Sequence, residues 1–117
     1  MTDERTNEQI SAAIAERLLR WVWVEAVSCW VDRDGLVVAT RSEFKPASDH
    51  NTALGLVVPE MRKRGWQFSL VDVGDEVRAV FFSKNLHRTV LASAPFGEEP
   101  CAICLAALAA LDQEGKG

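Results

Sequence analysis

The residues best suited to chemistry are two cysteines near the C-terminal end, in the stretch EEPCAICLAALAALDQ. Cys101 and Cys104 form a Cys-x-x-Cys pair, a spacing with which proteins hold zinc or carry out thiol redox reactions. A structural zinc ion takes four ligands, commonly from two such pairs. The other candidate ligands, Cys29, His50 and His87, stand alone and far apart in the sequence. The pattern therefore does not favour zinc.

Redox chemistry at the same pair is opposed by the residues before it. A helix N-terminus stabilises a thiolate, but Glu98 and Glu99 precede the pair and counteract that effect. At about 100° per residue, both sulfurs fall on one helix face with three leucines. We interpret this face as core, where free cysteine behaves as a small hydrophobic side chain. The opposite, alanine-rich face can lie against another backbone or face water, because alanine tolerates both. The expected core face consists of Cys101, Cys104, Leu105, Leu108 and Leu111.

Ser48, Asp49 and His50 bring together the three residue types of a hydrolytic triad. Neighbours in the first turn of a helix point in different directions, so adjacency does not make them a triad. We interpret Ser48 as a helix N-cap and His50 as a surface residue. The sequence contains no motif for dinucleotide, phosphate, zinc-protease or serine-hydrolase chemistry. We therefore expect no enzymatic activity, no catalytic residues, no metal and no cofactor.

The length and net charge of the chain limit the classes of protein to which it can belong. The 117 residues fit a single domain over residues 1–117, with residues 1–5 and 113–117 expected to be loose. A formal net charge of −4 argues against nonspecific binding to nucleic acid or anionic lipid. The polar start MTDERTNEQI is unlike a secretory signal, and no apolar run is long enough to span a membrane. Three cysteines, an odd number, fit a reducing compartment. We expect a cytoplasmic protein.

The first expected element is a helix. Thr6 and Gln9 form a capping box, and apolar residues at helical spacing predict a helix to about Val22. Glu16 and Arg20 would form a pair on its exposed side. The following WVWVEAV is ambiguous. We favour a helix end or turn there, and the alternative is an extended segment that puts Trp21 and Trp23 on one strand face.

A hairpin and a second helix follow. Asp34-Gly35 between apolar runs favours a tight turn joining strands near 29–33 and 36–41. The second helix is expected from the Ser48 cap to the cationic stretch before Gly65. Pro59 lies inside it and removes one helical hydrogen bond. Residue 55 is glycine, whose backbone can give way, so we predict a kink or break near Val58.

Alternation of apolar and polar residues predicts three further strands, near 66–71, 77–82 and 87–93, joined by short turns. A final helix is expected from Pro100 to about Leu111. Short connections make the strands antiparallel. The sequence thus predicts an α+β fold in which a hairpin and a three-stranded meander form antiparallel sheet, packed by three helices.

Four sequence stretches, FKPASD, GWQF, AVFF and PCAICLAALAAL, resemble the phage ABA sandwich domain family, whose members are small phage and prophage proteins. The resemblance spans about residues 6–112, and departs from the family pattern at Pro59 and around residues 21–29. It implies a layered α/β sandwich. The family has no established biochemical activity, so the resemblance implies no catalytic residues.

We predict that this chain is a non-enzymatic phage or prophage accessory protein, located in the bacterial host cytoplasm. It would bind a host or phage macromolecule, and inhibition of a host defence is one role that such binding could serve. A protein is the favoured partner. Trp and Arg are common interface anchors, so the candidate contacts are Trp23, Arg78, Lys84, His87 and Arg88. The alternative for Trp23 is a core position, and the alternative for the basic residues is a solvated strand face.

Two other functions stay open. A small ligand, such as a signalling nucleotide, could be sequestered at the seam of a homodimer without any sequence motif. Residues 49–111 also follow the helix, three strands, helix order of double-stranded-RNA-binding domains. Those domains need basic residues at the start of the last helix, where this chain has EEPCAIC. Nucleic acid is therefore not favoured, and no membrane partner is expected.

Overall fold

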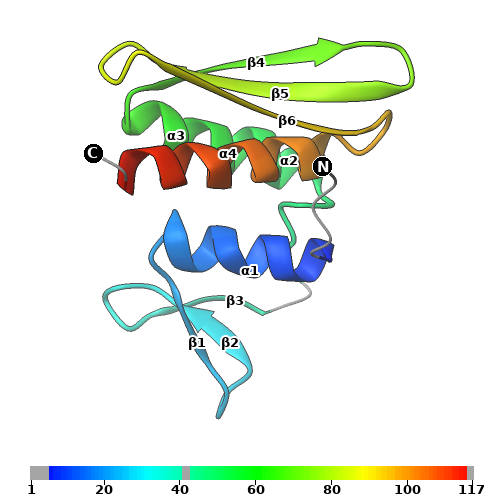
Figure 1. The fold of residues 1–117 in the computed structure, drawn as a ribbon. Helices are drawn as coiled ribbons and strands as arrows, with labels where there is room; N and C mark the ends of the chain where they lie inside the picture. Colours follow the sequence, from blue (N-terminus) through cyan, green and yellow to red (C-terminus); the bar gives the residue numbers. More distant parts are fainter. Residues whose placement is uncertain (1–5, 41–42, 116–117) are drawn as a thin grey trace.

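The computed structural model describes residues 6–40 and 43–115, which form an α+β fold as the sequence predicts (Figure 1). It has two separate three-stranded antiparallel sheets, not one. Helices lie between these sheets, so the molecule is layered (Figure 1). No helix in the described ranges is long and apolar enough to cross a membrane.

The larger sheet comes from the C-terminal half of the chain. Its strands are β4 (Trp66–Asp72), β5 (Glu76–Ser83) and β6 (Arg88–Pro95), in the order β4-β5-β6 and in unbroken register. The alternation seen in the sequence decides which face is buried. Every second residue of β5, starting at Val77, packs against the long helix α4 (Glu99–Gly115).

Helix α4 lies between the larger sheet and helix α1 (Asn7–Arg17), and is therefore buried on both sides (Figure 1). The alanine-rich face that the sequence left undecided is buried. Of its residues, Ala102, Ala106 and Ala110 have no exposed surface, and Ala109 is half-buried. On the cysteine face, Cys104, Leu108 and Leu111 are buried as expected, whereas Cys101 and Leu105 are half-buried.

Helix α1 begins as predicted but ends earlier. The capping box is formed, with the Gln9 amide N–H donating to Thr6 at 3.1 Å and the Thr6 N–H donating to the Gln9 side chain at 2.9 Å. The expected end near Val22 is wrong, because Arg20 adopts a left-handed backbone conformation with φ of 61°. The chain then turns, and the expected helical pair of Glu16 with Arg20 loses its geometry.

The smaller sheet follows directly. Its strands are β1 (Val22–Val24), β2 (Cys29–Val31) and β3 (Val37–Thr40), paired antiparallel in that order. The β2–β3 hairpin is confirmed, with Gly35 at a positive φ of 83° in its turn. For the stretch WVWVEAV we favoured a helix end or turn, and that preference was wrong. The extended alternative forms instead, as strand β1.

The second expected helix is divided into α2 (His50–Thr52), the π-helix η1 (Ala53–Val57) and α3 (Val58–Lys63). The predicted break near Val58 is confirmed, because Pro59 has no N–H for an ordinary helical bond. The cap needs correction. Asp49, not Ser48, is the N-cap, and its carboxylate accepts hydrogen bonds from the Asn51 amide and the Thr52 hydroxyl.

Helix α4 continues past the expected end at Leu111 to Gly115. Its last turn is held by the side chain of Glu114, which contacts residues of two other elements. Of the residues expected to be loose, 113–115 belong to α4, whereas 1–5, 116 and 117 lie outside the described residues, so their looseness stays a prediction.

Candidate functional site

An open groove of about 850 Å³ lies between helix α1 and the smaller sheet. We call it the aromatic groove. One wall is the surface of α1 from its cap to Glu16, and the other walls come from β1, β2 and the segment before α2. The lining residues are Thr6, Asn7, Glu8, Gln9, Ser11, Ala12, Glu16, Trp23, Trp30, Phe44, Lys45 and Ser48.

Two tryptophans from neighbouring strands provide most of the aromatic surface. Trp23 of β1 and Trp30 of β2 are direct cross-strand partners, and their rings meet edge to face at a centroid distance of 5.3 Å. Trp30 is buried, with 4% of its surface exposed, whereas Trp23 is half-buried. The Trp23 indole N–H donates to the Glu25 carboxylate at 2.6 Å. This hydrogen bond fixes the orientation of the outer ring.

The opposite wall is the segment Phe44–Ser48, which is tied to the rest of the fold at two points. The Phe44 ring packs on Trp21 at a centroid distance of 4.8 Å. The Ala47 amide donates to the buried hydroxyl of Ser11 on α1 at 3.1 Å. Because both walls are anchored, the groove is built by the fold and does not need a ligand to form it.

The rim carries charge of both signs. Glu8 and Glu16 stand on the α1 side, and Lys45 stands on the other. Lys45 also contributes to the lowered pKa of Asp49, although the hydrogen bond from Thr52 is the larger cause. An apolar floor with a polar rim is typical of recognition sites.

Of the predicted contact residues, only Trp23 lies in this groove. The basic residues belong to the larger sheet, on the other side of the helices (Figure 1). Arg78 is on the outer face of β5 and pairs with Glu76 at 3.2 Å. The structure does not bring Trp23 and the basic residues into one site.

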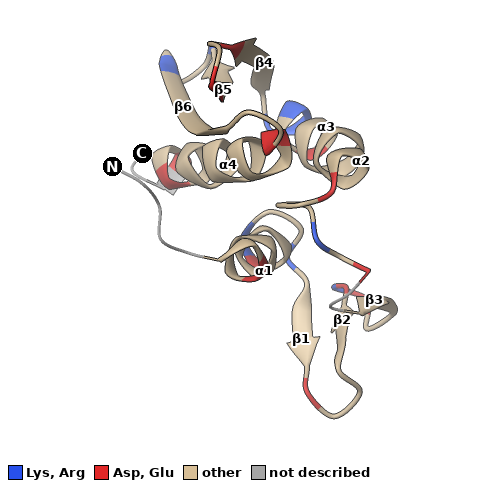
Figure 2. Cartoon of the chain, turned by 90° about the vertical axis from the view of Figure 1, so that its right-hand side faces the viewer, with Lys and Arg blue, Asp and Glu red and all other residues tan. Residues whose placement is uncertain are grey.

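The other three basic residues gather at the β5–β6 turn. Lys84 and His87 are exposed, and His87 takes a left-handed φ of 52° that the tight turn requires. Arg88 begins β6 and donates to the side chain of Gln113 on α4. Lys and Arg lie on several separate elements, without forming one basic face in the view shown (Figure 2).

Sequence reasoning missed Phe44, Lys45 and the α1 surface as lining residues, and left the exposure of Trp30 undecided. One signal was present. Trp23 and Trp30 face each other once β1 is a strand, because they flank a four-residue turn in a hairpin. No sequence pattern indicated that α1 would line the groove, since this depends on how the smaller sheet folds back onto the helix.

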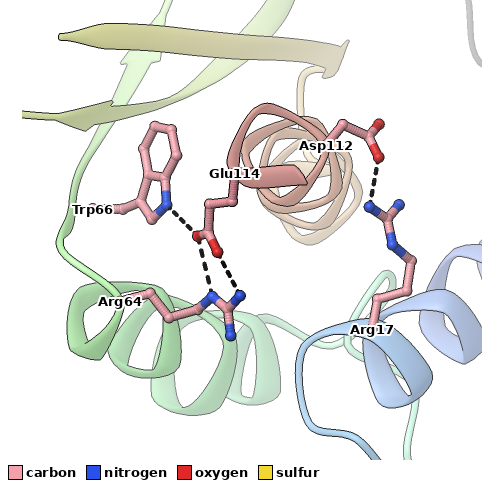
Figure 3. Close-up of polar contacts among 5 residues, drawn as sticks. All are labelled: Arg17, Arg64, Trp66, Asp112 and Glu114. Atoms are coloured by element: carbon pink, nitrogen blue, oxygen red, sulfur yellow. Dashed lines mark hydrogen bonds and ion pairs between the residues drawn. The ribbon is translucent and has the colours of Figure 1, made fainter. Parts of the chain in front are cut away.

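A second polar cluster lies where the C-terminal ends of α1, α3 and α4 meet (Figure 3). The Glu114 carboxylate accepts hydrogen bonds from Arg64 at 2.5 and 3.1 Å and from the Trp66 indole at 2.7 Å. Partial burial acts to raise the pKa of Glu114, but these hydrogen bonds lower it overall. Nearby, Arg17 pairs with Asp112 at 2.5 Å.

This Glu114 cluster is best explained as structural. Carboxylates near a helix C-terminus are disfavoured by the helix dipole, and cations there are favoured. Arg64 and Arg17 supply those cations, and they join α4 to α3 and to α1. Both guanidinium groups are already paired, so the cluster offers no ready anion site.

The two cysteines of the pair differ in burial, because Cys104 is buried and Cys101 is half-buried. Burial raises the pKa of the Cys104 thiol, so it stays protonated at neutral pH. Across residues 6–40 and 43–115, no group of three or more His, Cys, Asp or Glu side chains is placed to hold a metal ion. Cys104 thus lies in the core, as the helical pattern predicts.

Ser48, Asp49 and His50 each have a separate partner. The Ser48 hydroxyl lies 3.4 Å from the Lys45 carbonyl oxygen, Asp49 caps α2, and the His50 Nε2 lies 3.3 Å from a Glu99 carboxylate oxygen. Neighbours in sequence here point to different parts of the fold.

Comparisons of the chain with known protein families, with curated proteins and with solved structures gave no match. The resemblance to the phage ABA sandwich domain family stays a prediction.

Proposed function

We propose that this protein is a non-enzymatic binding protein whose aromatic groove holds an extended segment of a protein partner. The observation that carries the proposal is the edge-to-face pair of indoles, Trp23 and Trp30, on the floor of an open groove with a polar rim. Tryptophan supplies large contact area with few rotatable bonds, and it is a frequent interface anchor.

The shape of the groove favours an elongated occupant. Its α1 wall runs from Thr6 to Glu16, and ten helical residues rise about 15 Å. An extended chain advances about 3.3 Å per residue, so four or five residues would fit along this wall. Side chains on the rim, including Asn7 and Lys45, are placed to contact its backbone or polar groups.

Charge supports a protein partner over a nucleic acid. Glu8 and Glu16 line the groove, and Glu25 holds the outer indole. These carboxylates would repel phosphates, while Lys45 alone adds a positive charge to the lining. The sequence resemblance is what supports a partner from a bacterial host or its phage, and with it a role against host defence.

Selection from a library of eight-residue peptides on the immobilised protein tests the proposal. We expect recovered peptides to bind Trp23→Ala at least about 10-fold more weakly, because an anchoring tryptophan commonly contributes 2 kcal/mol or more. Ser48→Trp, which fills the groove and leaves the core untouched, should also weaken binding. Phe96→Ala is the matched control, since Phe96 is 61% exposed and lies in the loop after β6. Peptides that bind all variants equally, or no recovered peptides, would contradict the proposal.

The volume of the groove also suits a small ligand, because such pockets commonly measure about 300–1,000 Å³. A nucleotide-sequestering function is therefore the second candidate. A thermal-shift screen with nucleotides and cyclic dinucleotides tests it. Stabilisation that is lost in Trp23→Ala and kept in Phe96→Ala would favour this candidate over the peptide.

A further inference from the structure

Strand β4 forms one edge of the larger sheet and lacks the features that usually protect an edge. Within the described residues it pairs with β5 on one side only. Edge strands are commonly guarded by Lys, Pro or a bulge. Between Trp66 and Val73 the chain has no Lys, Arg or Pro, and its register with β5 has no bulge. The other edge strand, β6, is bounded by Arg88 and Pro95.

The second half of β4 is also uncovered on both faces. Leu70, on the face that carries α4, is 40% exposed, and Val71 on the opposite face is 42% exposed. Phe68 is half-buried beside Phe81, at a ring-centroid distance of 5.2 Å. The free hydrogen-bonding edge therefore coincides with unburied apolar side chains.

The geometry points to a second copy of this chain as the occupant, paired antiparallel through β4 to make one six-stranded sheet. The strand is complementary to itself. A two-fold axis at Ser69 places Phe68 opposite Leu70 of the second copy on the α4 side, and Gln67 opposite Val71 on the other. This register keeps apolar residues on the face that already holds the core.

Charge selects the same register. Asp72 is the only charged residue of β4, and like charges directly opposite each other destabilise a sheet. Centred on Ser69, each Asp72 faces Trp66 of the other copy instead of the other Asp72. Backbone hydrogen bonds would supply affinity, and the Phe68–Leu70 contacts would fix the alignment.

Sedimentation velocity of the full chain between about 1 and 100 µM tests this pairing, because a micromolar dimer dissociates over that range. We expect the wild type to dimerise as concentration rises. Leu70→Lys and Val71→Lys should each weaken dimerisation at least about 10-fold, since lysine on an edge strand opposes pairing. Leu91→Lys is the matched control, because Leu91 is 56% exposed on β6, the opposite edge. Circular dichroism verifies that each variant is folded.

The register has a separate test. Ser69→Cys should form a covalent dimer under mild oxidation with copper phenanthroline, because directly opposed residues bring Cα atoms within disulfide range. Wild type and Thr89→Cys on β6 give the background. A wild type that stays monomeric would overturn the inference, as would loss of the dimer in Leu91→Lys but not in Val71→Lys. Cross-linking of Ser69→Cys at background level would overturn the register. None of these outcomes depends on the aromatic groove.

Discussion

The two sheets of this protein differ in what supports them. The larger sheet has strands of seven to eight residues in unbroken register, and α4 covers one face of its strands β5 and β6. The smaller sheet has strands of three to four residues and a register shift between Trp30 and Val31. Trp30 is its one fully buried residue.

This difference separates stability from recognition. A two-layer core with a long helix supplies most of the buried apolar area, and thus most of the stabilising free energy. The smaller sheet and its β2–β3 turn leave Val22, Leu36 and Val37 more than half exposed, and the sheet positions the aromatic groove. Binding regions are commonly drawn from the less stable parts of a fold. The following predictions test whether the two sheets really divide in this way.

The largest effect is expected in the core of the larger sheet. Phe81 has no exposed surface, so Phe81→Ala should lower the free energy of unfolding by about 3–5 kcal/mol. Urea denaturation followed by circular dichroism measures it. Phe82→Ala, on the opposite face of the same strand, is the control and should cost less than half as much. Equal losses would mean that the outer face is as important as the core.

Trp30→Ala should act locally. Removing this ring takes the buried anchor from the smaller sheet, and we expect amide hydrogen exchange in β1–β3 to accelerate about 100-fold. Exchange in β5 should change far less. Val38→Ala, at a position 40% exposed on β3, is the control. If β5 amides accelerate equally with those of β1–β3, the two sheets unfold as one unit and the division is wrong.

Glu114→Gln should cost about 1–2 kcal/mol of stability, because it weakens hydrogen bonds to a charged group that is only 25% exposed. Asp112→Asn is the matched control. Its partner Arg17 is 40% exposed and Asp112 itself 58%, and such surface pairs contribute about 0–1 kcal/mol. Thermal or urea unfolding at neutral pH distinguishes the two variants, and equal effects would contradict the role of Trp66 and Arg64.

The Glu114 carboxylate also makes the stability of the fold depend on pH. The pKa of Glu114 in the folded state lies below its ordinary value of 4.5. The unfolded state therefore takes up this proton first as the pH falls. The stabilisation is fully present above about pH 4.5 and is lost as the pH falls through the lowered pKa. The free energy of unfolding of Glu114→Gln should therefore decrease less with falling pH than that of the wild type. Identical pH dependence in the two proteins would contradict this role of Glu114.

The smallest effect is at the start of α1. Thr6→Ala removes the capping hydroxyl and should cost about 1 kcal/mol, measured as a shift in the urea midpoint. Gln9→Ala removes the other half of the capping box and serves as the comparison. Because Thr6 also lines the aromatic groove, a loss of peptide affinity in Thr6→Ala, measured where the variant is fully folded, would show that the groove uses this residue directly.

The sequence was sufficient where local rules decide the outcome. The Thr6 capping box, the Asp34-Gly35 turn and the break before Pro59 each depend on the backbone chemistry of a few adjacent residues, and all three are found. The alternation in β5 likewise predicts which face is buried. These features supply enough of the element order to assign the α+β class.

Tertiary contacts decided the rest. Nothing in RLLRW marks the end of α1, because Arg20 takes a left-handed conformation that sequence rules reserve for glycine or asparagine. The Trp21 amide is instead held by the Ala15 carbonyl at 2.9 Å. Trp23 was identified as a contact candidate, but the groove that it lines with Trp30 and Phe44 is built from segments whose meeting depends on that turn. The basic residues were grouped by type, and the fold separates them from Trp23.

The position of α4 in the chain has a consequence for biosynthesis. This helix packs against both α1 and the larger sheet, yet it follows every other described element in sequence. During translation, the apolar sides of α1 and of β5 therefore leave the ribosome before the surface that will cover them exists. We therefore expect the core between α1 and the larger sheet to close only after α4 has emerged, and its apolar surfaces to need shielding, for example by chaperones, until then.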